Sequence, residues 1–122
     1  EEISINNFIY IEKNEIGKDQ EKEQLLIPPK IKENFQCDEN DNCVLKTDDF
    51  LLTYNSGLFF VNNNEENYTY NLNLNVFSYF NLKTLTNFEV ADNRVNCIKG
   101  NCENAEKIYN EFYKNYVEKY LK

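Results

Sequence analysis

The sequence predicts an α+β domain, in which a C-terminal amphipathic helix packs on an antiparallel sheet of about five to seven strands. Two observations carry this prediction. Residues 68–76 alternate strictly between apolar and polar side chains, which is typical of a strand with one buried face. After residue 101 the apolar side chains recur at intervals of three and four, which indicates a helix lying on a surface.

The stretch Tyr68–Phe80 is expected to form the central strand of this sheet. The apolar side chains of its first part share one face, and Thr69 and three asparagines occupy the other face. The alternation changes phase at Val76 and Phe77, so we expect a bulge or a strand break near that point.

The clearest hairpin pattern in the chain comes just before this stretch. Two apolar runs, 50–54 and 58–61, are separated by Asn55, Ser56 and Gly57. Glycine takes positive φ without steric cost, so these three residues predict a tight β-connection. Further strands are expected at residues 3–11, 31–37, 43–47 and 85–91.

The chain is long enough for one core, so we interpret residues 1–122 as a single domain. Residues 12–24 are almost entirely polar and charged, and they are expected to be a charged loop or disordered insert. The helix is predicted at residues 102–121. Asn101 or Asn104 would cap it, with acidic side chains in its first turn and lysines in its last.

The charge distribution argues against a nucleic-acid partner. The formal net charge is −8, and residues 1–49 hold 13 acidic against 6 basic side chains. Binding to phosphates requires clustered lysine and arginine, which this sequence lacks. No apolar run approaches the roughly 18 residues that a membrane-spanning helix needs, so no transmembrane segment is expected in this chain.

The four cysteines, Cys37, Cys43, Cys97 and Cys102, predict two disulfides and therefore a secretory or extracellular location. Four cysteines permit three connectivities, and their spacing does not choose among them. Turn-forming Asp, Asn and Gly residues separate the members of each close pair. We therefore favour the local pairings, Cys37 with Cys43 and Cys97 with Cys102.

Two metal sites compete with this interpretation. The four thiolates could form a structural zinc site, although such sites usually have closer spacing and there is no histidine to complete a mixed site. Asp38, Asn40, Asn42 and Asp49 match positions of a calcium loop, but Cys43 stands where that loop needs glycine. We expect no bound metal and interpret residues 38–42 as a solvated acidic turn.

The sequence also argues against catalysis. Without histidine, the Ser-His-Asp and Cys-His nucleophile systems cannot be built. The three glycines are isolated, so there is no glycine-rich phosphate loop. We therefore expect no catalytic residues and no cofactor.

Four tyrosines on the predicted helix are the candidate partner-binding residues. Tyrosine is favoured at interfaces because it offers a large contact area with a polar tip. Covering the sheet would explain any one of these rings, so the hypothesis applies to the group: some are exposed and contact a protein partner. Tyr113 and Tyr120 are expected to be the exposed ones. The four residues are Tyr109, Tyr113, Tyr116 and Tyr120.

Asparagine is the most unusual component of the composition, at 22 of 122 residues, and Asn62–Asn64 form an uninterrupted run. In this respect the chain resembles secreted and surface proteins of apicomplexan parasites with AT-rich genomes. The resemblance is compositional and implies a parasite surface protein involved in host interaction. Asn67 begins an Asn-Tyr-Thr glycosylation sequon, which would make the chain a glycoprotein.

A second resemblance covers about a dozen residues at the predicted hairpin. Tyr54, Asn55 and Gly57 form a Tyr-Asn-x-Gly sequence similar to a hairpin in the exclusion domain of cathepsin C-like dipeptidyl peptidases. The tryptophan and the cysteine placement of that domain are absent. The likeness implies a cleaved regulatory or pro-domain fragment associated with a protease, and residues 12–24 would then be the processing loop.

The function predicted from the sequence is therefore non-catalytic protein recognition at a cell surface or in a secretory compartment. The protease-associated fragment and a small structural zinc-binding domain are the two alternatives.

Overall fold

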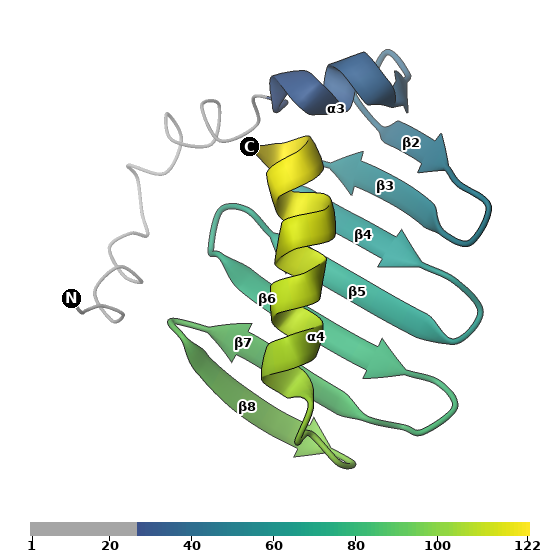
Figure 1. The fold of residues 1–122 in the computed structure, drawn as a ribbon. Coiled ribbons are helices and arrows are strands. Elements are labelled where there is room, and N and C mark those ends of the chain that lie inside the picture. The colour runs from purple at the N-terminus through teal and green to yellow at the C-terminus, as the bar shows by residue number, and fades with distance from the viewer. Residues whose placement is uncertain (1–26) are drawn as a thin grey trace.

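The computed structural model describes residues 27–122; the strand predicted at residues 3–11 and the charged insert at 12–24 lie outside the described residues. The described part of the chain forms one antiparallel sheet in which every strand pairs with its neighbours in sequence, followed by a helix that crosses the sheet (Figure 1). An antiparallel sheet with a C-terminal helix was predicted, but the sheet has eight strands, more than expected.

The strands are β1 (Gln36–Cys37), β2 (Cys43–Lys46), β3 (Leu51–Asn55), β4 (Leu58–Asn62), β5 (Glu66–Asn71), β6 (Val76–Asn81), β7 (Asn87–Ala91) and β8 (Arg94–Lys99). A short helix, α3 (Pro29–Asn34), precedes them. The C-terminal helix begins as α4 (Ala105–Phe112) and continues as a π-helical segment, η2 (Tyr113–Leu121).

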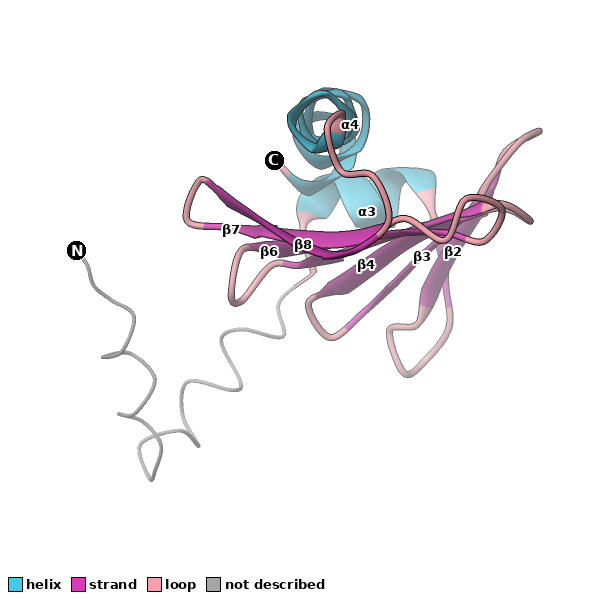
Figure 2. Ribbon diagram, turned by 90° about the horizontal axis from the view of Figure 1, so that it is seen from below, coloured by secondary structure: helices cyan, strands magenta, loops and turns pink. Residues whose placement is uncertain are grey.

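The two faces of the sheet have different surroundings. The helices lie on one face, and no described element covers the other (Figure 2). Phe59, Tyr70 and Phe77 are register partners on the helix-covered face and are almost completely buried. Phe112 of α4 packs on this row, with its ring 4.8 Å from that of Phe77. The core is therefore an aromatic layer between one sheet face and one helix.

The predicted central strand is wrong: Tyr68–Phe80 contains two strands and a turn. The chain leaves β5 at Asn71, whose side-chain oxygen accepts the backbone N–H groups of Asn73 (2.9 Å) and Leu74 (3.1 Å). Asn75 then takes a positive φ of 56° before β6 begins at Val76. Asparagine side chains can replace backbone partners in this way and tolerate positive φ, so alternating asparagines mark a turn here. The strand break expected near Val76 is confirmed, because the phase change in the sequence marks the start of β6.

The hairpin predicted at 50–61 is confirmed as β3 and β4, with Ser56 and Gly57 in the turn. Both residues have positive φ, 49° and 86°. A Cβ atom on Gly57 would lie 2.8 Å from the side-chain nitrogen of Asn73 in the β5–β6 turn, so that exposed side chain would have to move aside for a larger residue.

Two predictions near the ends of the sheet need correction. Residues 31–37 were expected to form a strand, yet most of them belong to α3, which starts at Pro29 and buries Ile31. Proline suits the first turn of a helix because its missing N–H has no partner there. The strand predicted at 85–91 is confirmed as β7, but β8 was not predicted, because its polar and apolar residues alternate over only four positions.

The predicted helix and disulfides agree with the structure. Asn104 precedes the first helical residue, although its side chain makes no capping hydrogen bond.

Cys37 is bonded to Cys43 and Cys97 to Cys102, so the local pairings are confirmed. Because both disulfides consume the thiols, the alternative of a four-thiolate zinc site is wrong. Among the described helices, none has the length and apolar character needed to cross a membrane.

Candidate protein-binding surface

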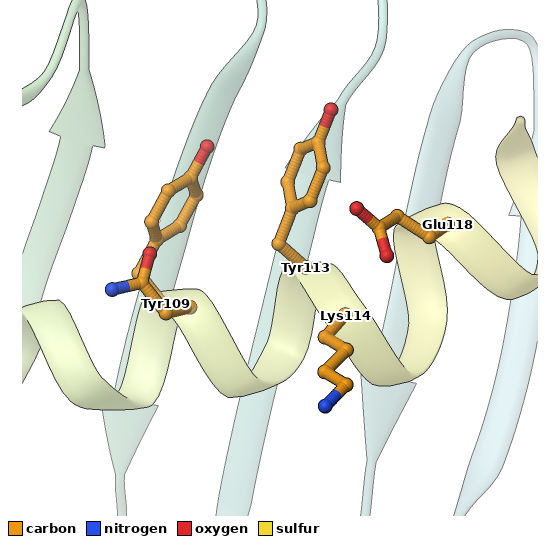
Figure 3. A pocket seen from close by; sticks show the side chains of 5 residues that line it. Tyr109, Tyr113, Lys114 and Glu118 are labelled. Atoms are coloured by element: carbon orange, nitrogen blue, oxygen red, sulfur yellow. The ribbon is translucent and has the colours of Figure 1, made fainter.

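The tyrosines of the C-terminal helix lie on two different flanks. Tyr109 and Tyr113, one helical turn apart, stand side by side on the flank that we call the open flank (Figure 3). Tyr116 lies on the other, which we call the closed flank, with its ring 6.3 Å from that of Phe50. Tyr120 is in the last turn. The four candidate residues are therefore not one surface.

On the open flank, each tyrosine is half-buried and packs on one side only. The Tyr109 ring lies 5.2 Å from Phe77 of the core and 5.9 Å from Tyr113. Tyr113 meets Tyr70 of β5 edge to face at 6.4 Å. The Lys122 ammonium lies 5.2 Å from the centre of the Tyr113 ring, a cation–π arrangement. The inner edges of these rings are held by the core, and their remaining surface faces solvent.

Two hollows adjoin the open flank. The larger, of about 410 Å³, is lined by Tyr109, Asn110, Tyr113, Lys114 and Glu118 (Figure 3). The smaller, of about 180 Å³, shares Tyr109 and Asn110 and lies against the β7–β8 hairpin. Its other lining residues are Val90, Asn93, Val95 and Glu106. Together they offer aromatic area surrounded by an amide and by charged side chains, as in interfaces that have an aromatic centre and a polar rim.

The hydroxyl groups on this flank influence one another. Burial raises the pKa of Tyr70 to about 12, and the neighbouring Tyr109 and Tyr113 hydroxyls add to the effect. Burial followed by the proximity of Tyr113 also raises the pKa of Tyr109. Contact with the Tyr113 hydroxyl raises the pKa of Lys122. The Tyr70 and Tyr109 hydroxyls thus stay neutral and able to donate hydrogen bonds, beside a lysine that stays charged.

The closed flank carries a network of polar groups that the sequence did not reveal. The Tyr79 hydroxyl donates to the Glu66 carboxylate at 2.7 Å. The buried Asn81 amide donates to the Tyr79 oxygen at 3.0 Å and to the Glu65 carboxylate at 3.2 Å. Burial, with the nearby Glu66 charge, strongly raises the pKa of Tyr68. These groups already have partners inside the protein, so this flank offers less to another molecule.

The sequence contained one weak indication of this network. Glu66 and Asn81 are register partners on the helix-covered face, where apolar residues are expected. That pairing can be recognised only when the β5–β6 register is known.

Tyr120 was expected to be exposed, and that expectation is wrong. Its side chain is 8% exposed and meets Phe35 edge to face at 5.4 Å. Phe35 follows α3, and α3 packs against η2. Because residues 31–37 were predicted to be a strand, the prediction contained no element that could cover the last turn of the helix.

The remaining predicted sites lie away from the open flank. Asn67 is in β5 on the uncovered sheet face, opposite Asn62 and Phe80, and its glycosylation stays a prediction.

The Asp38 carboxylate accepts backbone N–H groups from Asn40 (2.8 Å) and Asn42 (2.9 Å). These bonds lower the pKa of Asp38 and account for the acidic sequence as a turn. Within residues 27–122, no three acidic or cysteine side chains are grouped to hold a metal ion.

Comparison with known proteins identified no relative of this chain. No protein family, no curated protein and no solved structure matches this chain. The site must therefore be interpreted from its own geometry.

Proposed function

We propose that this chain is a non-catalytic protein-recognition module of the cell surface or secretory pathway, and that it binds a protein partner through the open flank. The observation that carries the proposal is the pair Tyr109 and Tyr113, half-buried side by side, which both line the larger hollow, while Tyr109 also lines the smaller one. Rings that are held by a core on one edge lose little entropy on binding, so such tyrosines are effective contact residues.

The location is supported by the two disulfides, which persist in oxidising compartments and are rare elsewhere. The abundance of asparagine supports the further proposal of a parasite surface or secreted protein that contacts host proteins, and Asn67 is its candidate glycosylation site.

The test compares variants of the disulfide-bonded chain of residues 1–122 for binding to proteins of an extracellular fraction. The double variant Tyr109→Ser and Tyr113→Ser should lose the partner that the unmodified chain retains. Leu82→Ser is the matched control, because Leu82 is a 50% exposed apolar residue in the β6–β7 turn, away from the flank. Binding should fall at least tenfold in the double variant and stay unchanged in the control.

Each protein must first show the disulfides and thermal transition of a folded chain. If the folded double variant binds as well as the unmodified chain, the open flank is not the binding surface. If Leu82→Ser removes binding instead, the partner contacts the opposite rim of the sheet.

A further inference from the structure

The sheet face opposite to the C-terminal helix combines exposed apolar side chains with an absence of charge. In the described sheet, none of the side chains that β3, β4, β5 and β6 place on this face is charged, although 28% of the chain's residues are. Leu51 and Leu58 are 41% and 36% exposed. Phe60 and Phe80 are half-buried, and no described element lies over them (Figure 2). A broad uncharged face of this kind is typical of a surface that another group covers.

Asn67 lies near the middle of this face. Among the 22 asparagines it alone begins an Asn-x-Ser/Thr sequence. Asn67 lies opposite Phe80 of β6, and Thr69, the last residue of the sequon, lies opposite Phe60 of β4. Side chains directly opposite each other have Cβ atoms about 5 Å apart, and diagonal neighbours are about 7–8 Å apart. The Asn67 amide therefore has one phenylalanine on each side, close enough for an attached sugar to contact.

We propose that Asn67 carries an N-linked oligosaccharide that lies back on the sheet and covers this uncharged face. The proposal rests on the secretory location proposed above, because such sugars are transferred in that compartment. In the transfer, the Asn67 amide nitrogen loses one proton and forms a bond to C1 of N-acetylglucosamine. The bond between C1 and the pyrophosphate of a lipid-linked oligosaccharide breaks, and the lipid pyrophosphate leaves.

The chemistry of this face suits a sugar. The C–H face of a pyranose ring packs on a phenylalanine ring, and its hydroxyl and acetamido groups form hydrogen bonds with amide and hydroxyl side chains. Asn62, Thr53 and Ser78 lie around the two rings and supply such groups. A second copy of the chain is a poorer occupant. It would bury these polar groups against one another, at a cost unless each is paired.

The first test is whether the sugar is present. The chain of residues 1–122 is secreted from cultured animal cells, and its mass is measured before and after treatment with a peptide-N-glycosidase. Thr69→Ala removes the sequon and keeps Asn67, whereas Thr69→Ser preserves the sequon. Thr53→Ala is the matched control, because Thr53 also lies opposite Phe60 on the same face. Every chain except Thr69→Ala should lose the mass of an oligosaccharide, and an unmodified chain without sugar would overturn the proposal.

The second test is whether the sugar covers the face. Hydroxyl-radical footprinting, read by mass spectrometry, measures how fast Phe60 and Phe80 are oxidised. Both should react at least about twofold more slowly in the glycosylated chain than in Thr69→Ala, because a bulky glycan excludes solvent from the rings. Thr53→Ala should behave as the unmodified chain does. Tyr113, on the other side of the sheet, is the internal reference and should react equally in all the proteins.

Three results of this second test would contradict the proposal. A sugar that leaves Phe80 as reactive as it is in Thr69→Ala points away from the sheet. If both rings react slowly even in Thr69→Ala, another part of the chain or a second copy covers the face, and sedimentation at two concentrations distinguishes these two. If Thr53→Ala loses the protection while it keeps its sugar, the loss of a threonine, and not of the sugar, exposes the rings.

The sugar and the open flank can be tested separately, because they lie on opposite sides of the sheet. The double variant Tyr109→Ser and Tyr113→Ser should keep the sugar and its protection of the rings. Thr69→Ala should keep the protein partner. Loss of binding in the first variant and loss of sugar in the second are therefore independent results.

Discussion

The two flanks of the C-terminal helix rest on the same sheet face but end in different surroundings. On the closed flank, Tyr79 donates to Glu66, and a buried asparagine completes the network. On the open flank, Tyr113 meets the rings of Tyr70 and Tyr109 and one lysine, and then faces solvent. Tyrosines thus stabilise the fold on the closed flank, whereas on the open flank part of their surface remains accessible to another molecule. The two flanks differ in whether neighbouring strands supply hydrogen-bonding partners for the tyrosine hydroxyl.

Phe112 belongs to both flanks, and its removal should have the largest effect. Its ring stacks 5.2 Å from Tyr68 on the closed flank and lies 6.4 Å from Tyr70 on the open one. Phe112→Ala should lower the free energy of unfolding by about 3–5 kcal/mol, since it leaves a cavity in the aromatic layer. Urea denaturation measures this change. A loss below about 1 kcal/mol would show that the two flanks do not share a core.

The next largest difference is expected between a buried and a partly exposed tyrosine of the C-terminal helix. Tyr120→Ala should cost about 3 kcal/mol, because the ring is buried against Phe35. Tyr113→Ala should cost less, because its ring is only partly buried and its outer part faces solvent. Denaturation curves of the two variants, recorded under the same conditions, measure the difference. Equal losses would mean that the open flank is as much a part of the core as the last turn.

The sequence predicted those parts of the fold that depend on local rules. The hairpin at Ser56–Gly57 follows from the conformational freedom of glycine, and the helix follows from the spacing of its apolar residues. The disulfide pairs follow from the turn residues between the cysteines. Each of these elements is specified within a few neighbouring residues, so tertiary context was not needed.

The errors came where a pattern has two physical explanations. Alternating leucine and asparagine between Asn71 and Asn75 suits a strand, but the Asn71 side chain stabilises a turn instead. The edge strand β8 alternates between polar and apolar residues over only four positions, 94–97, and its six residues are all exposed, so its pattern was too short to predict a strand. The burial of Tyr120 depends on α3, which is distant in sequence. At the candidate site, the tyrosines were identifiable from composition, whereas their division into two flanks required the packing.

The smallest expected loss of stability follows from removing a single hydroxyl, which can be compared between Tyr79 on the closed flank and Tyr70 on the open flank. Tyr79→Phe should cost about 1 kcal/mol at neutral pH, because it removes the donation to Glu66 and the acceptance from Asn81. Tyr70→Phe should cost less, since the Tyr70 hydroxyl makes a single longer bond of 3.2 Å to Asn75. Denaturation at pH 7 measures both losses, and a cost for Tyr70→Phe equal to that of Tyr79→Phe would contradict the difference between the flanks.

Alkaline pH tests the same two residues in a second way. Burial raises the pKa of both Tyr79 and Tyr70 from 10.0 to about 12. A raised pKa in the folded state means that unfolding releases protons above pH 10, so this contribution to stability is complete below pH 10 and is lost as the pH rises towards 12. Each phenylalanine variant should therefore lose less stability than the unmodified chain between pH 10 and 12, a difference that tyrosinate absorbance and urea denaturation measure together. A variant whose stability declines as steeply as that of the unmodified chain would show that its tyrosine titrates at the ordinary value, and that burial on that flank does not exclude water from the hydroxyl.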